Sequence, residues 1–182
     1  EKITYVTSLE NNISKRSPEN LGTSNANGIE INGKLDVSKI IVITSDFNLN
    51  RFNRRGIWGS QNFNFNGTRW SSEFRSKIKF PKDLDIELTL NYLSEYRTVD
   101  GERGPSRNIN FGVRKKIVDG RGVINLMVRD IFGTRVSESR AIRSNFIVNN
   151  WSTSGTFFSL GFSYGFGKGE AMEYQSKGGR RR

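Results

Sequence analysis

Cysteine and histidine are absent from this chain of 182 residues, and proline and long apolar runs are scarce. The absence of cysteine excludes disulfide bonds and thiolate chemistry. The absence of histidine removes the commonest metal ligand and general base. No stretch approaches the roughly 18 apolar residues that a membrane-spanning helix needs. The chain is therefore not a helical membrane protein, but strands that cross a membrane are compatible with its composition.

Glycine, aromatic residues and positive charge are abundant instead. The chain has 19 glycines, 13 phenylalanines and a net charge of +11. The aromatic residues supply enough apolar area for a folded structure, and the charge raises the question of nucleic-acid binding. The cations are spread along the whole sequence and form no single patch, which favours another explanation of the charge.

The clearest alternation runs over residues 155–167, in GTFFSLGFSYGFG. From Phe158 onward serine and glycine occupy one face of this stretch, and a period of two predicts a strand. A strand at the surface of a soluble protein would carry long polar side chains on its wet face, whereas small residues facing a crowded lumen are typical of a membrane β-barrel. We expect the residues of the other face to contact lipid: Phe158, Leu160, Phe162, Tyr164 and Phe166.

A second strand is predicted at residues 84–93, in LDIELTLNYL. We expect its apolar side chains to face lipid as well: Leu84, Ile86, Leu88 and Leu90. Acidic residues on the opposite face, such as Glu87, share it with several cations of the preceding stretch, such as Arg75 and Lys77. A wall of ion pairs explains these carboxylates more economically than general acid–base catalysis does.

The connections between the strand candidates fall into two classes. Those at 36–39, 81–83 and 118–122 are short, and those at 10–27, 51–68, 98–106 and 133–154 are long and polar. Short periplasmic turns and long external loops are typical of outer-membrane barrels. The sequence therefore predicts an all-β fold, a transmembrane antiparallel up-and-down β-barrel segment of about eight strands over residues 1–167, followed by a basic periplasmic tail at 168–182.

Three stretches resemble a known family when they are taken together: LTLNYLSEYRTVDG, INFGVRKKIVDGRGVINLMVRDIFGT and FFSLGFSYGFGKG. They resemble the carboxy-terminal barrel portion of TonB-dependent-receptor-like outer-membrane β-barrel proteins of the Bacteroidota type, and NLGTSNANGIEINGKL is similar to the same family. The resemblance implies a 22-stranded barrel with an amino-terminal plug and a TonB box, of which this chain supplies about the last eight strands. We expect the chain to be the carboxy-terminal piece of such a protein, because no signal peptide precedes its first alternating residues.

The resemblance implies uptake of a solute across the cell outer membrane, with no catalytic residues, no metal and no cofactor. We expect substrate-binding residues in the long loops: Arg54, Arg55, Trp58, Arg103 and Arg140. The expected partners are outer-membrane lipid and lipopolysaccharide, the remainder of the barrel with its plug, TonB and a surface lipoprotein, but no nucleic acid. Two other interpretations stay open: a self-contained eight-stranded barrel with a structural, adhesive or complex-subunit role, and a soluble basic β-sandwich that binds nucleic acid.

Overall fold

The computed structural model describes residues 3–11, 13–20, 22–58, 61–99, 101–142 and 146–167. All regular secondary structure in these residues is β-strand. The same part of the chain contains no helix that is long and apolar enough to cross a membrane. The tail expected at 168–182 lies outside the described residues.

The described residues form thirteen strands, and every strand pairing is antiparallel. The strands are β1 (Ile3–Glu10), β2 (Ile13–Asn20), β3 (Thr23–Asp36), β4 (Ile41–Trp58), β5 (Gln61–Phe80), β6 (Leu84–Leu93), β7 (Tyr96–Arg97), β8 (Gly101–Arg103), β9 (Ser106–Ile117), β10 (Gly122–Arg129), β11 (Val136–Ile142), β12 (Ile147–Thr153) and β13 (Phe157–Tyr164). The main sheet has seven strands in the order β13-β10-β9-β6-β5-β4-β3. A four-stranded sheet has the order β12-β11-β8-β7, and β1 and β2 form a hairpin.

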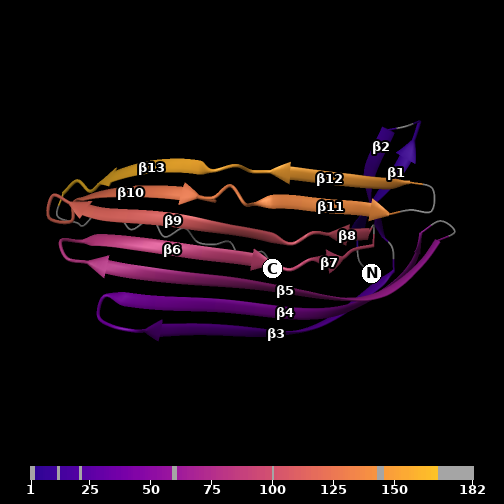
Figure 1. Cartoon of the computed structure of the whole chain (residues 1–182), viewed down its shortest axis with the longest axis horizontal. Coiled ribbons are helices and arrows are strands. Elements are labelled where there is room, and N and C mark those ends of the chain that lie inside the picture. Colours follow the sequence, from indigo (N-terminus) through magenta and orange to yellow (C-terminus); the bar gives the residue numbers. More distant parts are fainter. Residues whose placement is uncertain are drawn as a thin grey trace.

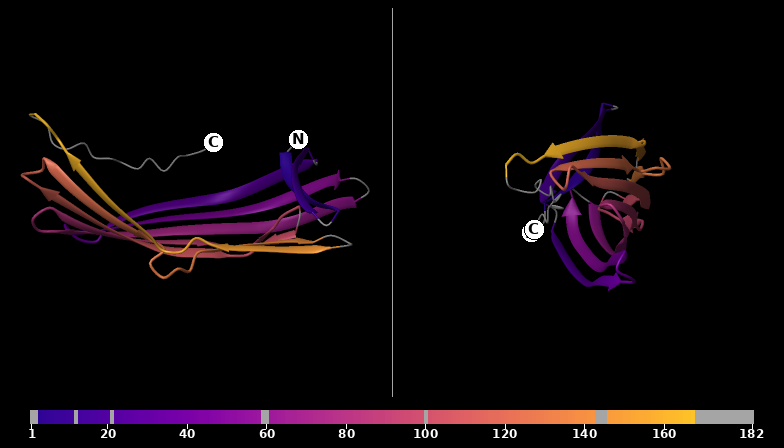
Figure 2. Two further views of the ribbon diagram at one scale, coloured as in Figure 1. Left: turned by 90° about the horizontal axis from the view of Figure 1, so that it is seen from above. Right: turned by 90° about the vertical axis from the view of Figure 1, so that its left-hand side faces the viewer.

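The smaller sheet prolongs the main one, as Figure 1 shows. Strands β7, β8, β11 and β12 lie beyond β6, β9, β10 and β13, at the end opposite the short turns. Figure 2 shows that the main sheet bends into an arc. Within the described residues β3 and β13 are its two edges and do not pair with each other. The two sheets together therefore form a curved, open β-sheet surface, which we call the wall.

The sequence prediction was right about the strand type and antiparallel order but wrong about the strand number and the loops. We expected about eight strands, and the structure has thirteen in open sheets. The stretches 10–27, 51–68, 98–106 and 133–154 were expected to be loops. They contain β2 with the start of β3, the far halves of β4 and β5, β8, and β11 with β12. Their backbones pair like the rest of the sheet, while polar residues and glycines interrupt the apolar alternation that marks a strand.

Strand register places the apolar and the charged residues on opposite faces of the main sheet. One row of directly paired residues crosses five strands as Ile78, Ile86, Val113, Leu126 and Leu160. The neighbouring row on the other face consists of Lys77, Glu87, Gly112, Met127 and Ser159. Because successive side chains point to opposite faces, this register gives the sheet one apolar face and one polar face.

The apolar face is the convex one. In Figure 2 the turn between β10 and β11 projects from the convex side of the arc. Phe132 of that turn lines a cavity together with Leu90 and Ile109, which belong to the apolar face. The charged face is therefore concave, and it lies on the inside of the arc.

The described residues contain very little buried apolar core. The buried apolar side chains are Val6, Phe52, Val123 and Ala141. By contrast, Phe158 is 67% exposed and Leu160 is 75% exposed. A soluble sheet would cover such a face with a second layer, and a continuous exposed apolar surface of this kind indicates an apolar environment or a partner.

Phe52 packs across the outer part of the sheet, beyond the apolar band. It pairs directly with Gly67 on β5, and its ring lies over that glycine. The ring also contacts Phe65 edge-on, with 6.2 Å between ring centroids, and the Arg54 guanidinium lies 4.7 Å from the Phe52 centroid. The missing side chain of Gly67 therefore provides the space that this aromatic cluster fills.

We expect Gly67→Ala to destabilise the full-length protein by about 1–3 kcal/mol, because the added methyl group would occupy the position of the Phe52 ring. Gly33→Ala is the matched control, since a Cβ there would meet only the Ser45 carbonyl oxygen at 3.9 Å. The measurement is urea unfolding of the protein folded in lipid vesicles. Equal midpoints for the two variants would show that the ring does not need this space.

Candidate functional site

The convex face carries an apolar band bounded by aromatic residues. Trp70 stacks on Tyr92 with ring centroids 4.5 Å apart, and Tyr164 contacts Phe166 at 5.0 Å near the short turns. Residues 84 to 92 of β6 span about 26 Å at the rise of a β-strand. This height is close to the roughly 25 Å apolar band of outer-membrane barrels, which is also flanked by aromatic girdles.

The register brings eight of the nine residues expected to face lipid onto this one convex face. The β6 residues Leu84, Ile86, Leu88 and Leu90 share it with the β13 residues Phe158, Leu160, Phe162 and Tyr164. Phe166 follows the end of β13, so strand pairing does not fix its face, and it is 90% exposed. The band can therefore cover hydrocarbon along the whole width of the sheet.

The concave face carries a ladder of ion pairs, as the sequence predicted. Arg75 lies 2.7 Å from Glu73 and 3.5 Å from Glu87, and Lys77 lies 3.0 Å from Asp85. These side chains are a quarter to nearly half exposed, so water screens the pairs and each stabilises the fold only weakly. The described residues contain no group of three or more acidic side chains that could hold a metal ion. The arrangement provides a wet, charged wall.

Asp130 organises the turn that separates β10 from β11. Its carboxylate is buried and accepts hydrogen bonds from the Thr134 amide at 2.9 Å, the Thr134 hydroxyl at 3.2 Å and the Arg135 amide at 2.9 Å. The Asp130 amide donates to Asn110 Oδ1 at 3.0 Å, and its carbonyl oxygen accepts from the Thr156 hydroxyl at 2.8 Å. The sequence VRDIFGT thus encodes a fixed turn that places Phe132 beside Leu90 and Ile109, two residues of the convex face.

A cavity of about 770 Å³ lies in the outer part of the wall, beyond the apolar band. Strands β4, β5, β7, β8 and β11 supply its lining, and most of its side chains are charged. The charged lining residues are Arg51, Glu95, Arg97, Glu102, Arg103, Glu138 and Arg140. Both signs are present, so the cavity suits a ligand that offers hydrogen-bond donors and acceptors to charged groups.

The structure brings together two of the five residues expected to bind substrate. Arg103 and Arg140 both line this cavity. Arg54 instead lies over the Phe52 and Phe65 rings, and Arg55 is exposed opposite Thr23. Trp58 ends β4, but its side chain lies outside the described residues. Sequence reasoning missed the other charged lining residues, which only the pairing of β7, β8 and β11 assembles.

Residues 1–164 match the model of the outer membrane protein beta-barrel family. The chain belongs to this family. Membership implies an outer-membrane location, and it agrees with the all-β antiparallel fold and the exposed apolar face. No curated protein and no solved structure that was compared matches the chain.

In this outer-membrane protein, we expect Asp130→Ala to lower the free energy of unfolding by about 2–3 kcal/mol, because two backbone amides and one hydroxyl lose a charged acceptor. Asp130→Asn should cost less, since asparagine keeps one acceptor oxygen and tolerates the φ of 51° found here. The measurement is urea unfolding in vesicles, with the exposed Asp36→Ala as control. A midpoint for Asp130→Ala equal to that of Asp36→Ala would contradict the role of this carboxylate.

Proposed function

We propose that this chain forms the carboxy-terminal strands of a TonB-dependent receptor that takes up a solute across the outer membrane. The observation that carries the proposal is the open, curved sheet, with an apolar convex face, a charged concave face and two edges that do not pair with each other. A free sheet edge in a membrane would leave backbone groups without partners, so such a wall needs further strands on both sides. A barrel of about 22 strands, as in plugged outer-membrane transporters, would supply them.

The two faces of the wall have the chemistry expected of the inner and outer surfaces of a transporter barrel. The concave charged ladder would line the pathway around a plug, and the convex band would contact lipid. With the short turns in the periplasm, the tail at 168–182 would also lie there. The 770 Å³ cavity with Arg103 and Arg140 lies at the opposite end, where it would take part in substrate capture outside the cell. TonB, the plug and a surface lipoprotein would be the partners of the complete protein.

The open sheet weighs against the self-contained eight-stranded barrel. Such a barrel would have to close its main sheet by pairing the two edge strands, and β3 and β13 do not pair with each other within the described residues. A soluble nucleic-acid-binding sandwich would bury the residues of the convex face, which the arc leaves exposed. We therefore propose no second function.

The lipid contact can be tested with neighbouring positions on β13 that point to opposite faces. Leu160→Arg should lower the free energy of unfolding by about 2–4 kcal/mol, because it would place a cation near the middle of the apolar band. Ser159→Arg should have little effect, since Ser159 lies on the concave face opposite Met127. Urea unfolding of the full-length protein in vesicles gives both values. Equal losses for the two variants would refute the assignment of the convex face to lipid.

TonB-dependent uptake predicts a shared growth defect. A strain that lacks this protein should fail on a particular iron, peptide or carbohydrate source, and a strain that lacks TonB should fail on the same source. The comparison uses growth on a panel of sole nutrient sources, with the deleted gene restored as control. Normal growth of the TonB-deficient strain on that source would exclude energised transport. Reading the coding sequence upstream of Glu1 for a plug and a TonB box is an independent check.

A further inference from the structure

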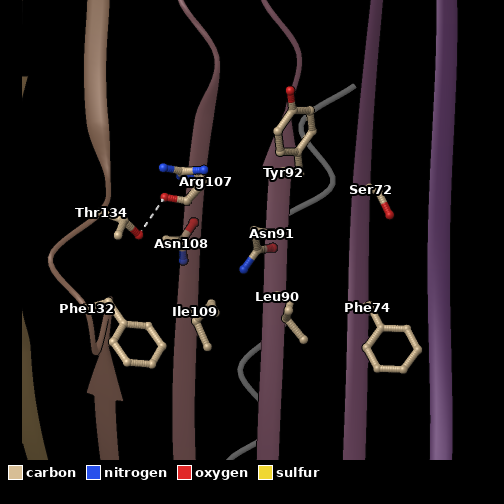
Figure 3. A pocket seen from close by; sticks show the side chains of 10 residues that line it. All are labelled: Ser72, Phe74, Leu90, Asn91, Tyr92, Arg107, Asn108, Ile109, Phe132 and Thr134. Atoms are coloured by element: carbon tan, nitrogen blue, oxygen red, sulfur yellow. Dashed lines mark hydrogen bonds between the residues drawn. The ribbon is translucent and has the colours of Figure 1, made fainter.

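We propose that a groove on the convex face binds an acyl chain of lipid A, and that Arg107 pairs with a phosphate of its head group. The groove has a volume of about 390 Å³, within the usual range for small-ligand sites. Its apolar lining residues are Phe74, Leu90, Ile109 and Phe132. Figure 3 shows these four side chains in one row across neighbouring segments, with Arg107, Tyr92 and Thr134 in the next row.

The Asp130 turn builds one wall of this groove. The turn interrupts the path from β10 to β11 and projects from the convex side of the arc (Figure 2), and the side chain of its Phe132 is 68% exposed. Two hydrogen bonds fix the turn to the neighbouring strand β9: Ile131 N donates to Ile109 O at 2.9 Å, and Asp130 N donates to Asn110 Oδ1 at 3.0 Å. Phe132 therefore stands in a defined position beside Ile109, which a flexible loop would not provide. The groove is part of the fold.

Arg107 places a cation at the outer end of the groove. It pairs across the strands with Tyr92, on the convex face, and its side chain is exposed. No ion pair joins it to an acidic residue within the described part of the chain. A guanidinium binds a phosphate group through two parallel hydrogen bonds, so a phosphate is the complementary ligand for this position.

The position of the groove along the strands places it at the level of the outer leaflet. The groove adjoins Tyr92, which stacks on Trp70 at the aromatic end of the apolar band far from the short turns. Aromatic girdles lie at the head-group level of the membrane. With the short turns on the periplasmic side, the head groups at this end belong to the outer leaflet, where the phosphorylated glycolipid is the abundant anionic species. This inference requires the outer-membrane location of the family and does not depend on TonB-dependent uptake.

The test is native mass spectrometry of the full-length protein in detergent, titrated separately with lipid A, dephosphorylated lipid A and phosphatidylglycerol. We expect a lipid A adduct, with apparent affinity about tenfold lower for dephosphorylated lipid A and for Arg107→Gln. Arg107→Lys should retain part of the affinity because it keeps the charge. Phe132→Ser should weaken both forms of lipid A alike. Arg121→Gln, an exposed arginine in the turn at the opposite end, is the matched control.

Each result decides for or against the site. Unchanged lipid A binding by Arg107→Gln would overturn the phosphate contact, and unchanged binding by Phe132→Ser would overturn the groove. Equal affinity for phosphatidylglycerol would replace the glycolipid with a phospholipid and overturn the proposed ligand. Phe132→Leu serves as a second, conservative variant if Phe132→Ser does not fold, and it should weaken binding less than the loss of the side chain.

Discussion

Antiparallel hydrogen-bonded register is the constraint on which the rest of this structure depends. The pairing of β4 with β5 runs without a break from Ile41 opposite Ile78 to Trp58 opposite Gln61. Because side chains alternate between faces, this continuous pairing fixes which residues lie on the convex face over the whole wall. A slip of one residue in any strand would move its charges into the apolar band. The scarcity of buried side chains shows that backbone pairing, and not a packed core, defines the fold.

The turn at Asp130 interrupts the path of the chain between β10 and β11. Both of these strands are paired with antiparallel neighbours. A buried carboxylate and a left-handed residue at its first position form the turn within a few residues, and Gly133 completes it with a φ of 62°. A polar turn of this kind is stable beside an apolar band because its amides are satisfied internally. It also projects from the convex face, and thereby forms a groove next to the aromatic girdle.

The strands continue well beyond the apolar band. The 18 residues of β4 and the 20 residues of β5 exceed the 9–11 residues that a transmembrane strand needs. In this outer part of the sheet, aromatic and cation–π contacts join neighbouring strands. The Phe52 ring lies over Gly67, and the Arg54 guanidinium lies over the Phe52 ring. The mixed charges of the large cavity belong to this region, so the membrane-spanning and the ligand-facing parts of the wall are separate along the strand axis.

The sequence by itself determined the strands of the apolar band, their faces and their short turns, because a side chain's face follows from its parity alone. Leu160 and Ser159 are an example, and so are the charges of Arg75 and Glu87 on one side of the sheet. Only the tertiary structure decided that β4 and β5 extend into 51–68 and that 133–154 contain β11 and β12, since polar residues and glycines interrupt the apolar alternation there. It also decided that Arg103 and Arg140 share a cavity, that Arg54 packs on aromatic rings, and that Phe132 forms the wall of a groove. These contacts join residues distant in the chain, and their positions depend on inter-strand register that no local pattern contains.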